Sequence, residues 1–138
     1  MILWVDDDLS LTLKSFMDEL KENGYEIIMV TNPDDISDKF AQYNITGIIM
    51  DIMLPTGQSI SNEDSKMGIL TGLEILKKLK EDKTTSQIPI VIFTILSNQD
   101  VSTWARVNNI KLLKKEQTVP LDLLAAVIET QMKKDTND

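Results

Sequence analysis

The chain has 138 residues, of which 42% are hydrophobic and 26% are charged, a composition typical of one globular domain with a sizeable core. Acidic residues outnumber basic ones by 22 to 14, and the resulting net charge of −8 argues against a nucleic-acid-binding face and against attraction to anionic membranes. The chain contains neither Cys nor His, which excludes disulfides, zinc sites built on those residues and histidine-dependent nucleophiles.

The first half of the chain alternates between strand-like and helix-like patterns. Residues 2–5 form a continuous apolar run, which predicts a strand buried on both faces of a parallel sheet. Residues 13–20 have apolar side chains at helical spacing, and the Asn-Gly pair at 23–24 supplies a helix stop. A second continuous run follows at 27–30, and Pro33 opens a second helix.

The second half continues the alternation. Its apolar runs predict strands at 48–54, 90–93 and 112–113, and its periodic segments predict helices near 71–79, 101–108 and 120–132. The order predicts an α/β fold, with one parallel sheet, right-handed crossovers and helices on both faces. We assign residues 1–133 to a single domain and residues 134–138 to a polar tail.

A long connection interrupts this rhythm. Residues 56–70 lie between the third strand and the third helix, where ordinary strand-to-helix loops have about 2–6 residues. This inserted segment begins with Gly, Ser, Asn and acidic residues. Its position at the carboxyl end of a strand is typical of functional or disordered loops.

Charged and polar side chains follow the predicted strands. Ligands of open α/β sheets bind beyond the carboxyl ends of the strands, so these residues are candidates for a site. Asp6 and Asp7 follow the first strand, Asp51 lies within the third, Thr94 ends the fourth and Lys114 ends the fifth. If the first and third strands are neighbours, these groups share one edge of the sheet.

The acids point to a hard-cation site. A carboxylate such as Asp51 inside an apolar run carries a desolvation cost of several kcal/mol unless it is paired. Two carboxylates ~4 Å apart repel each other by ~4 kcal/mol at an effective dielectric constant near 20. Mg²⁺ removes this repulsion, and Asp51 can then act as a nucleophile towards phosphorus. The cation, Lys114 and the Thr94 hydroxyl would stabilise charge on the transferred group.

Structural explanations compete with each of these roles. Asp8 can cap the first helix, and Asp6 and Asp7 can be solvated turn residues. Thr94 taken alone is an ordinary β-branched strand residue, and a lysine such as Lys114 after a strand often solvates an edge. The weight of the functional interpretation rests on the combination rather than on any one residue.

The combination resembles the receiver domain of two-component response regulators of the chemotaxis-receiver type. The resemblance covers nearly the whole chain and is carried by residues 2–8, 47–55, 71–76 and 89–94. It implies a flavodoxin-like, doubly wound five-stranded sheet in the order 2-1-3-4-5. The acidic cluster together with residues 51–55 is the most specific part of the match.

The resemblance also implies a role for each site residue. Asp51 would be the phosphoacceptor, receiving a phosphoryl group from a histidine of a partner kinase. Asp7 would be the main Mg²⁺ carboxylate and Asp6 its companion, with Asp51 and the Met53 carbonyl completing the protein ligands. Thr94 would follow the phosphoryl group, and Lys114 would be the lysine of the site, preferred to Lys115 because it directly follows residues 112–113.

Three departures from the family pattern stand out. The inserted segment replaces a short loop, and we expect it to overhang the phosphorylation site and bring Glu63 or Asp64 near it. Thr71 replaces the acid that precedes the glycine of the third helix. Ile95 stands where a small residue usually follows the threonine, so we expect it to crowd the phosphoryl pocket.

The first functional hypothesis is a phosphorelay switch that catalyses its own phosphorylation and dephosphorylation and is not a turnover enzyme. Its expected partners are a histidine kinase or phosphotransfer protein and a downstream protein effector, with no direct contact to nucleic acid or membrane. We expect a cytoplasmic protein that is a monomer or a phosphorylation-dependent dimer. The alternatives are a receiver-like adapter that takes up no phosphate, favoured by Ile95 and the inserted segment, and a Mg²⁺-dependent phosphohydrolase.

Overall fold

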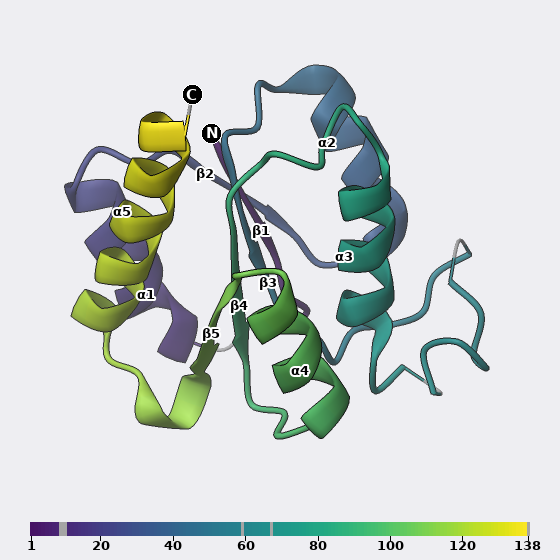
Figure 1. The fold of residues 1–138 in the computed structure, drawn as a ribbon. Helices are drawn as coiled ribbons and strands as arrows, with labels where there is room; N and C mark the ends of the chain where they lie inside the picture. The colour runs from purple at the N-terminus through teal and green to yellow at the C-terminus, as the bar shows by residue number, and fades with distance from the viewer. Residues whose placement is uncertain (9–10, 59, 67, 138) are drawn as a thin grey trace.

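A computed structural model describes residues 1–8, 11–58, 60–66 and 68–137 of the chain. In this part of the chain five parallel strands form one sheet in the order β2-β1-β3-β4-β5 (Figure 1). The strands are β1 (Ile2–Val5), β2 (Ile27–Val30), β3 (Gly47–Met50), β4 (Ile90–Thr94) and β5 (Lys111–Lys114). The predicted fold class and strand order are therefore confirmed.

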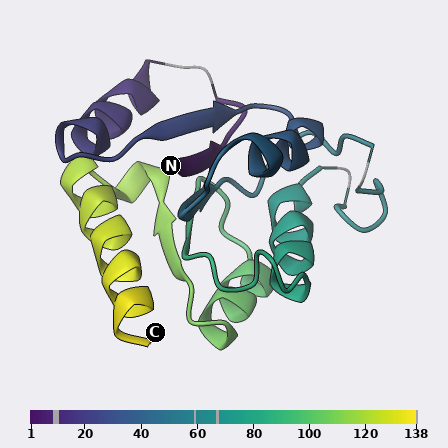
Figure 2. The ribbon, with the colours of Figure 1, turned by 90° about the horizontal axis from the view of Figure 1, so that it is seen from above.

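Helices cover both faces of the sheet. They are α1 (Thr12–Glu22), α2 (Ile36–Gln42), α3 (Thr71–Glu81), α4 (Gln99–Val107) and α5 (Pro120–Asn137), with short 3₁₀ turns at Pro33–Asp35 and Lys115–Gln117. Figures 1 and 2 show α1 and α5 on one face and α2, α3 and α4 on the other. None of the helices in the described residues is long and apolar enough to cross a bilayer.

The strands have two buried faces because successive side chains point to opposite sides of the sheet. In β1, Leu3 and Val5 pack in the core under α2, α3 and α4, whereas Ile2 and Trp4 pack in the core under α1 and α5. The ring of Trp4 meets that of Phe93 edge-on, with 6.0 Å between the ring centroids. This two-sided burial explains why the strand sequences are continuously apolar.

The third strand is shorter than its apolar sequence suggests. β3 ends at Met50, whereas the predicted strand continued to residue 54. Beyond it, Ile52 and Leu54 are buried in the core with Leu73 and Leu76 of α3. The apolar pattern there reflects burial in a loop and not strand pairing.

Two helix boundaries are fixed by residues at the helix ends themselves, as the sequence predicted. Gly24 has φ +90°, a conformation that glycine adopts without strain, and its N–H bonds to the Lys21 carbonyl at the end of α1. The Asn32 side chain accepts a bond from the N–H of Asp34 just before α2. At the other end of the chain the backbone of α5 continues through Asn137, and the division into a 1–133 domain and a tail stays a prediction.

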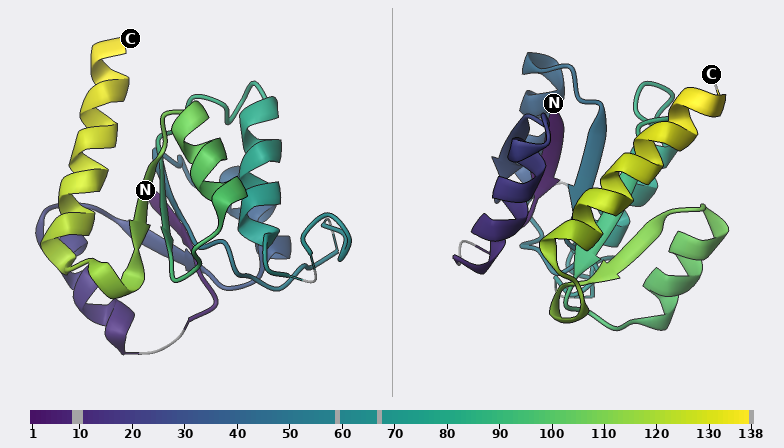
Figure 3. Two further views of the ribbon diagram at one scale, coloured as in Figure 1. Left: turned by 60° about the horizontal axis from the view of Figure 1, so that its bottom comes forward. Right: turned by 90° about the vertical axis from the view of Figure 1, so that its left-hand side faces the viewer.

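The inserted segment, residues 56–70, leaves the end of β3 and returns to the start of α3. Figures 1 and 3 show it extending outward beyond α3. It is attached by buried side chains, including Ile60, Ser65 and Leu70, and by a bond of 2.8 Å from the N–H of Gln58 to Oδ1 of Asp34. The Gly72 N–H bonds to the Ile52 carbonyl at 2.8 Å, which joins the two ends of the insertion.

Candidate functional site

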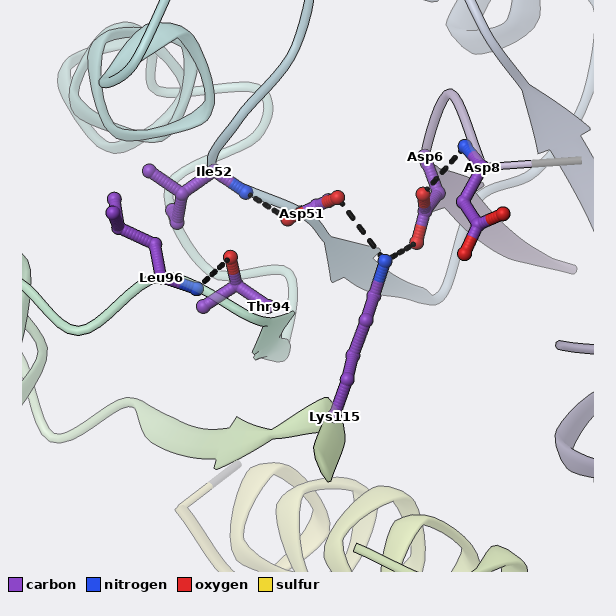
Figure 4. A network of polar contacts seen from close by, with 7 residues as sticks. All are labelled: Asp6, Asp8, Asp51, Ile52, Thr94, Leu96 and Lys115. Atoms are coloured by element: carbon purple, nitrogen blue, oxygen red, sulfur yellow. Dashed lines mark hydrogen bonds and ion pairs between the residues drawn. The ribbon is translucent and has the colours of Figure 1, made fainter. Parts of the chain in front are cut away.

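Strand alternation brings three charged side chains to one edge of the sheet. Asp6 follows Trp4 by two residues, Asp51 follows Ile49, and Lys115 follows Leu113. Trp4, Ile49 and Leu113 all pack in the core under α1 and α5. Residues two positions further along continue to the same side, and Figure 4 shows Lys115 pointing between Asp6 and Asp51.

Asp51 is held by contacts to both of its carboxylate oxygens. The side chain is buried, with the residue only 4% exposed. Its Oδ1 accepts a bond of 2.7 Å from the N–H of Ile52, and its Oδ2 accepts one of 3.2 Å from Nζ of Lys115. Its own N–H bonds to the Val5 carbonyl at 2.9 Å, so the pairing of β1 with β3 fixes its backbone. The carboxylate is thus oriented from two sides.

Asp6 is fully buried beside it. Oδ1 accepts a bond of 2.9 Å from the N–H of Asp8, and Oδ2 lies 2.8 Å from Nζ of Lys115 in an ion pair. Among the described residues, Lys115 is the polar group that contacts Oδ2. Burial raises the pKa of Asp6, although Lys115 and the Asp8 N–H act in the opposite direction. The ionised form of Asp6 therefore lacks part of the stabilisation it would have in water.

Lys115 balances the two carboxylates. Its side chain is 12% exposed, and its Nζ lies 5.9 Å from the centre of the Phe93 ring. Burial on its own would lower the pKa of Lys115, but hydrogen bonding and charge attraction to Asp6 and Asp51 outweigh it and raise the pKa. The ammonium group is therefore held in its charged form.

The acids fit a hard cation. Asp6, Asp7 and Asp51 each offer a carboxylate oxygen, and these atoms lie within 4.8 Å of one another. Asp7 is exposed, which leaves this side of the cluster open to solvent. A donor set made only of carboxylate oxygens suits Mg²⁺. Asp6, Asp7 and Asp51 could hold such an ion.

The preference for Lys114 is corrected by the geometry. Lys114 ends β5 opposite Thr94, and its Nζ contacts Oγ of Ser97 in the loop after β4. It lies on the side of Leu112, whose side chain packs in the core under α2, α3 and α4. Because residues 112 and 113 are both apolar, the sequence did not reveal which of them faces the acids. Lys115 lies two residues after Leu113 and therefore on the same side of the sheet, where it pairs with Asp6 and Asp51.

Thr94 ends the strand next to β3, and Met53 lies in the loop that follows β3. Thr94 is fully buried at the end of β4, the strand next to β3, and its Oγ1 accepts a bond of 3.2 Å from the N–H of Leu96. Met53 lies two residues after Asp51 and is 38% exposed. The roles assigned to Thr94 and to the Met53 carbonyl stay predictions. Ile95 is 54% exposed, so its side chain lies largely at the surface.

Two sequence expectations about neighbouring acids are wrong. Asp8 does not cap the first helix, because α1 begins at Thr12 with Leu11 in the capping position and no side-chain cap. Glu63 and Asp64 do not belong to the acidic cluster, which among the described residues comprises Asp6, Asp7 and Asp51. The inserted segment instead bonds to Asp34 and places Lys66 3.9 Å from Asp100.

Comparison of the sequence with characterised proteins finds response regulators. The chain is 31% identical over 88 residues to the polar-differentiation response regulator DivK of Brucella anthropi, a match that covers 64% of this chain and 61% of DivK. It is 29% identical over 93 residues to the probable transcriptional regulator ycf29 of Pyropia yezoensis, covering 67% of this chain and 36% of that protein. The chain thus spans less than two thirds of these relatives. No family model matches it.

Solved structures share the fold over almost the whole chain. A CheY-like response regulator receiver domain from Methanospirillum hungatei superposes with a TM-score of 0.76 at 20% identity, covering 99% of this chain and 97% of that one. The chemotaxis protein CheY4 of Vibrio cholerae gives a TM-score of 0.70 at 20% identity, covering 94% and 96%. The chain is thus similar in sequence to response regulators over about two thirds of its length, and it shares the fold of CheY-like receiver domains.

Proposed function

We propose that the chain is a phosphoacceptor switch of a two-component phosphorelay, in which Asp51 receives a phosphoryl group. The observation that carries the proposal is the arrangement of Asp51 at the end of β3, held by Lys115 and flanked by Asp6 and Asp7. Asp6 and Asp51 share one ammonium group, and Asp7 adds a third carboxylate whose oxygen lies within 4.8 Å of theirs. The surplus negative charge would attract a divalent cation, and the Asp51 carboxylate would serve as the nucleophile towards phosphorus.

In the proposed reaction the Asp51 carboxylate attacks the phosphorus of a phosphohistidine on a partner. A phosphorus–oxygen bond to Asp51 forms as the phosphorus–nitrogen bond breaks, and the electron pair of that bond stays on the imidazole of the donor. The Ile52 N–H and the Lys115 ammonium keep the carboxylate oriented before the attack. Lys115 is close enough to neutralise charge that develops on the transferred group.

Asp6 and Asp7, with Asp51, would hold Mg²⁺ at this edge. Bound there, the ion supplies positive charge to the phosphoryl oxygens during transfer. Thr94, at the end of the neighbouring strand, would turn its hydroxyl towards the phosphoryl group and give up its bond to the Leu96 N–H. That exchange would carry the signal into the loop that precedes α4.

The output would be a changed surface rather than a released product, as in a signalling switch and not a turnover enzyme. The face built by α4, β5 and α5 is suited to a protein effector because apolar side chains are exposed on and beside it: Val107, Val119, Leu121, Ile128 and Met132. Lys114 connects β5 of this face to Ser97 in the loop after β4. We place the protein in the cytoplasm, with a histidine kinase or phosphotransfer protein as donor.

Incubation with acetyl phosphate and Mg²⁺, followed by intact-protein mass spectrometry, tests the proposal. We expect the mass to rise by one phosphoryl group in the wild type and in Asp64→Asn, which changes an exposed acid of the inserted segment. We expect no gain in Asp51→Asn, and a much slower gain in the wild type when EDTA removes the cation.

Failure of the wild type to gain mass while it remains folded and binds Mg²⁺ would contradict the proposal and favour the adapter that takes up no phosphate. Equal labelling of the wild type and Asp51→Asn would contradict the choice of Asp51. Release of many phosphate groups per protein molecule from small phosphate esters would favour the phosphohydrolase.

A further inference from the structure

A groove of about 730 Å³ lies between α2 and α3, built by groups other than the acids of the proposed phosphorylation site. Its volume is in the range of sites that bind organic ligands and peptide side chains. Apolar side chains from three parts of the chain line it: Ile36 and Phe40 of α2, Ile60 of the inserted segment, and Ile75 and Leu79 of α3. Figure 1 shows α2 and α3 side by side at this place.

The inserted segment forms one part of this groove. Ile60 is 5% exposed and packs in the same core cluster as Ile36 and Ile75. The segment is fixed to α2 by the bond from the Gln58 N–H to Asp34. Gly57 suits this turn, because it has φ +65° and an added Cβ would lie 2.5 Å from Oδ1 of Asp34 and displace that carboxylate. The lining is therefore a product of specific packing.

The charges on the lining indicate what the groove could accept. Two carboxylates, Asp34 and Asp82, line it together with one lysine, Lys78. Hydrogen bonds from Thr84 lower the pKa of Asp82, so this group stays ionised at neutral pH. An apolar floor with acidic side chains beside it complements an apolar surface flanked by cations. A second copy of this chain, with its own net charge of −8, is a poor electrostatic match.

We propose that the groove between α2 and α3 docks a short amphipathic helix of a partner protein, with basic residues flanking its apolar stripe. Helices bind such grooves through apolar side chains at i, i+3 or i+4, and i+7. α3 has 11 residues and a length of roughly 16 Å, which matches a helix of about three turns. This docking surface is distinct from the face of α4, β5 and α5 and does not depend on Asp51.

A display library of helix-biased 16-residue peptides, with both apolar and charged positions varied, tests the proposal. The library is selected on the full chain and counter-selected on Ser37→Arg, because exposed Ser37 lines the groove and arginine there adds bulk and positive charge. We expect the selected peptides to carry net positive charge and an apolar stripe. Fluorescence anisotropy then measures the binding of one labelled peptide from the selection.

Two double variants separate local from general charge effects. We expect Asp34→Asn with Asp82→Asn to weaken binding at least tenfold. Glu22→Gln with Glu26→Gln, exposed acids in and just after α1, should change it less than twofold. Amide NMR shifts should map to α2, α3 and the inserted segment, in Asp51→Asn as in the wild type.

Several results would overturn the proposal. One is that every selected peptide binds folded Ser37→Arg as well as it binds the wild type. Another is that the selection enriches acidic peptides. A third is that the two double variants lose the same amount of peptide affinity. Shifts confined to α4, β5 and α5 would also overturn it. So would self-association of the chain that Ser37→Arg abolishes, because the occupant would then be a second copy.

Discussion

The acidic site and the inserted segment both lie next to the end of β3, but different interactions fix their conformations. Asp6, Asp51 and Lys115 occupy positions dictated by strand register; the two acids are buried, and the Lys115 side chain is only 12% exposed. The inserted segment depends on a few attachments, such as buried Ile60 and the Gln58 bond to Asp34. Its ion pair from Lys66 to Asp100 is long and exposed.

This difference indicates which contacts contribute most to the free energy of unfolding. In the site, charges have been removed from water, so each lost partner leaves a large uncompensated cost. In the inserted segment, charges remain solvated and each contact contributes little. The following predictions compare the two regions, beginning at the residue where they meet.

Gly72→Ala should have the largest effect because Gly72 packs where the inserted segment ends against the backbone of the site. An added Cβ would lie 2.0 Å from the Asp51 carbonyl oxygen and 2.7 Å from Cα of Ile52. We expect a loss of about 4 kcal/mol or more in the free energy of unfolding, measured with urea. Helix propensity alone would give a gain of about 1 kcal/mol. A neutral or stabilising result would show that α3 is not fixed against β3.

Lys115→Met should come next. It leaves Asp6 and Asp51 buried together without their cation, and we expect a loss of about 3 kcal/mol in metal-free protein. The matched variant Lys114→Met should stay within about 0.5 kcal/mol, because the contact it removes is exposed. Urea unfolding of both variants measures the contrast. Equal losses would contradict the assignment of Lys115 to the site.

Asp6→Asn should alter the pH dependence of stability. Because burial raises the folded-state pKa of Asp6 above 3.8, the folded protein binds this proton more tightly than the unfolded chain does. This group therefore makes stability fall as pH rises from about 3.8 through the folded pKa. In EDTA the free energy of unfolding of the asparagine variant should therefore rise relative to that of the wild type over this pH window, and its Tm should rise with it.

Thermal unfolding across pH 3 to 8, with and without Mg²⁺, measures this gain. Mg²⁺ should reverse the order, because the wild type keeps the carboxylate that would bind it. If Asp6→Asn is less stable than the wild type in EDTA at neutral pH, the ion pair with Lys115 outweighs burial and the prediction is wrong.

Lys66→Ala should have the smallest effect. The Lys66–Asp100 pair is 3.9 Å long, and both side chains are mostly exposed, so we expect a change below about 0.5 kcal/mol that disappears in high salt. Urea unfolding at low and high salt checks this. A loss above 1 kcal/mol would mean that the inserted segment is held as firmly as the acidic site.

The same contrast explains what could be predicted from the sequence. Continuous apolar runs located the strands, and a stop signal such as Gly24 marked a helix end, because these patterns act locally. The convergence of Asp6, Asp7 and Asp51 followed from the parallel topology. The choice between Lys114 and Lys115 required knowing which face each residue of β5 presents, and a strand with two apolar faces hides that information.

The inserted segment could be recognised as extra but not placed. Its path depends on contacts between residues distant in sequence, such as Gln58 with Asp34 and Lys66 with Asp100. Composition carries no sign of such pairs. The expectation that it covers the site came from its attachment at β3, whereas Figure 3 shows it extending outward beyond α3.

The hydrogen bond between the Gly72 N–H and the Ile52 carbonyl makes the connection modular. Because this bond brings the two ends of the connection together, its length is nearly decoupled from the framework, and each doubling of such a loop costs only about 0.6 kcal/mol in closure entropy. The length of the connection can therefore change at little cost in closure entropy, whereas the buried side chains of Ile60, Ser65 and Leu70 tie parts of its sequence to the rest of the domain.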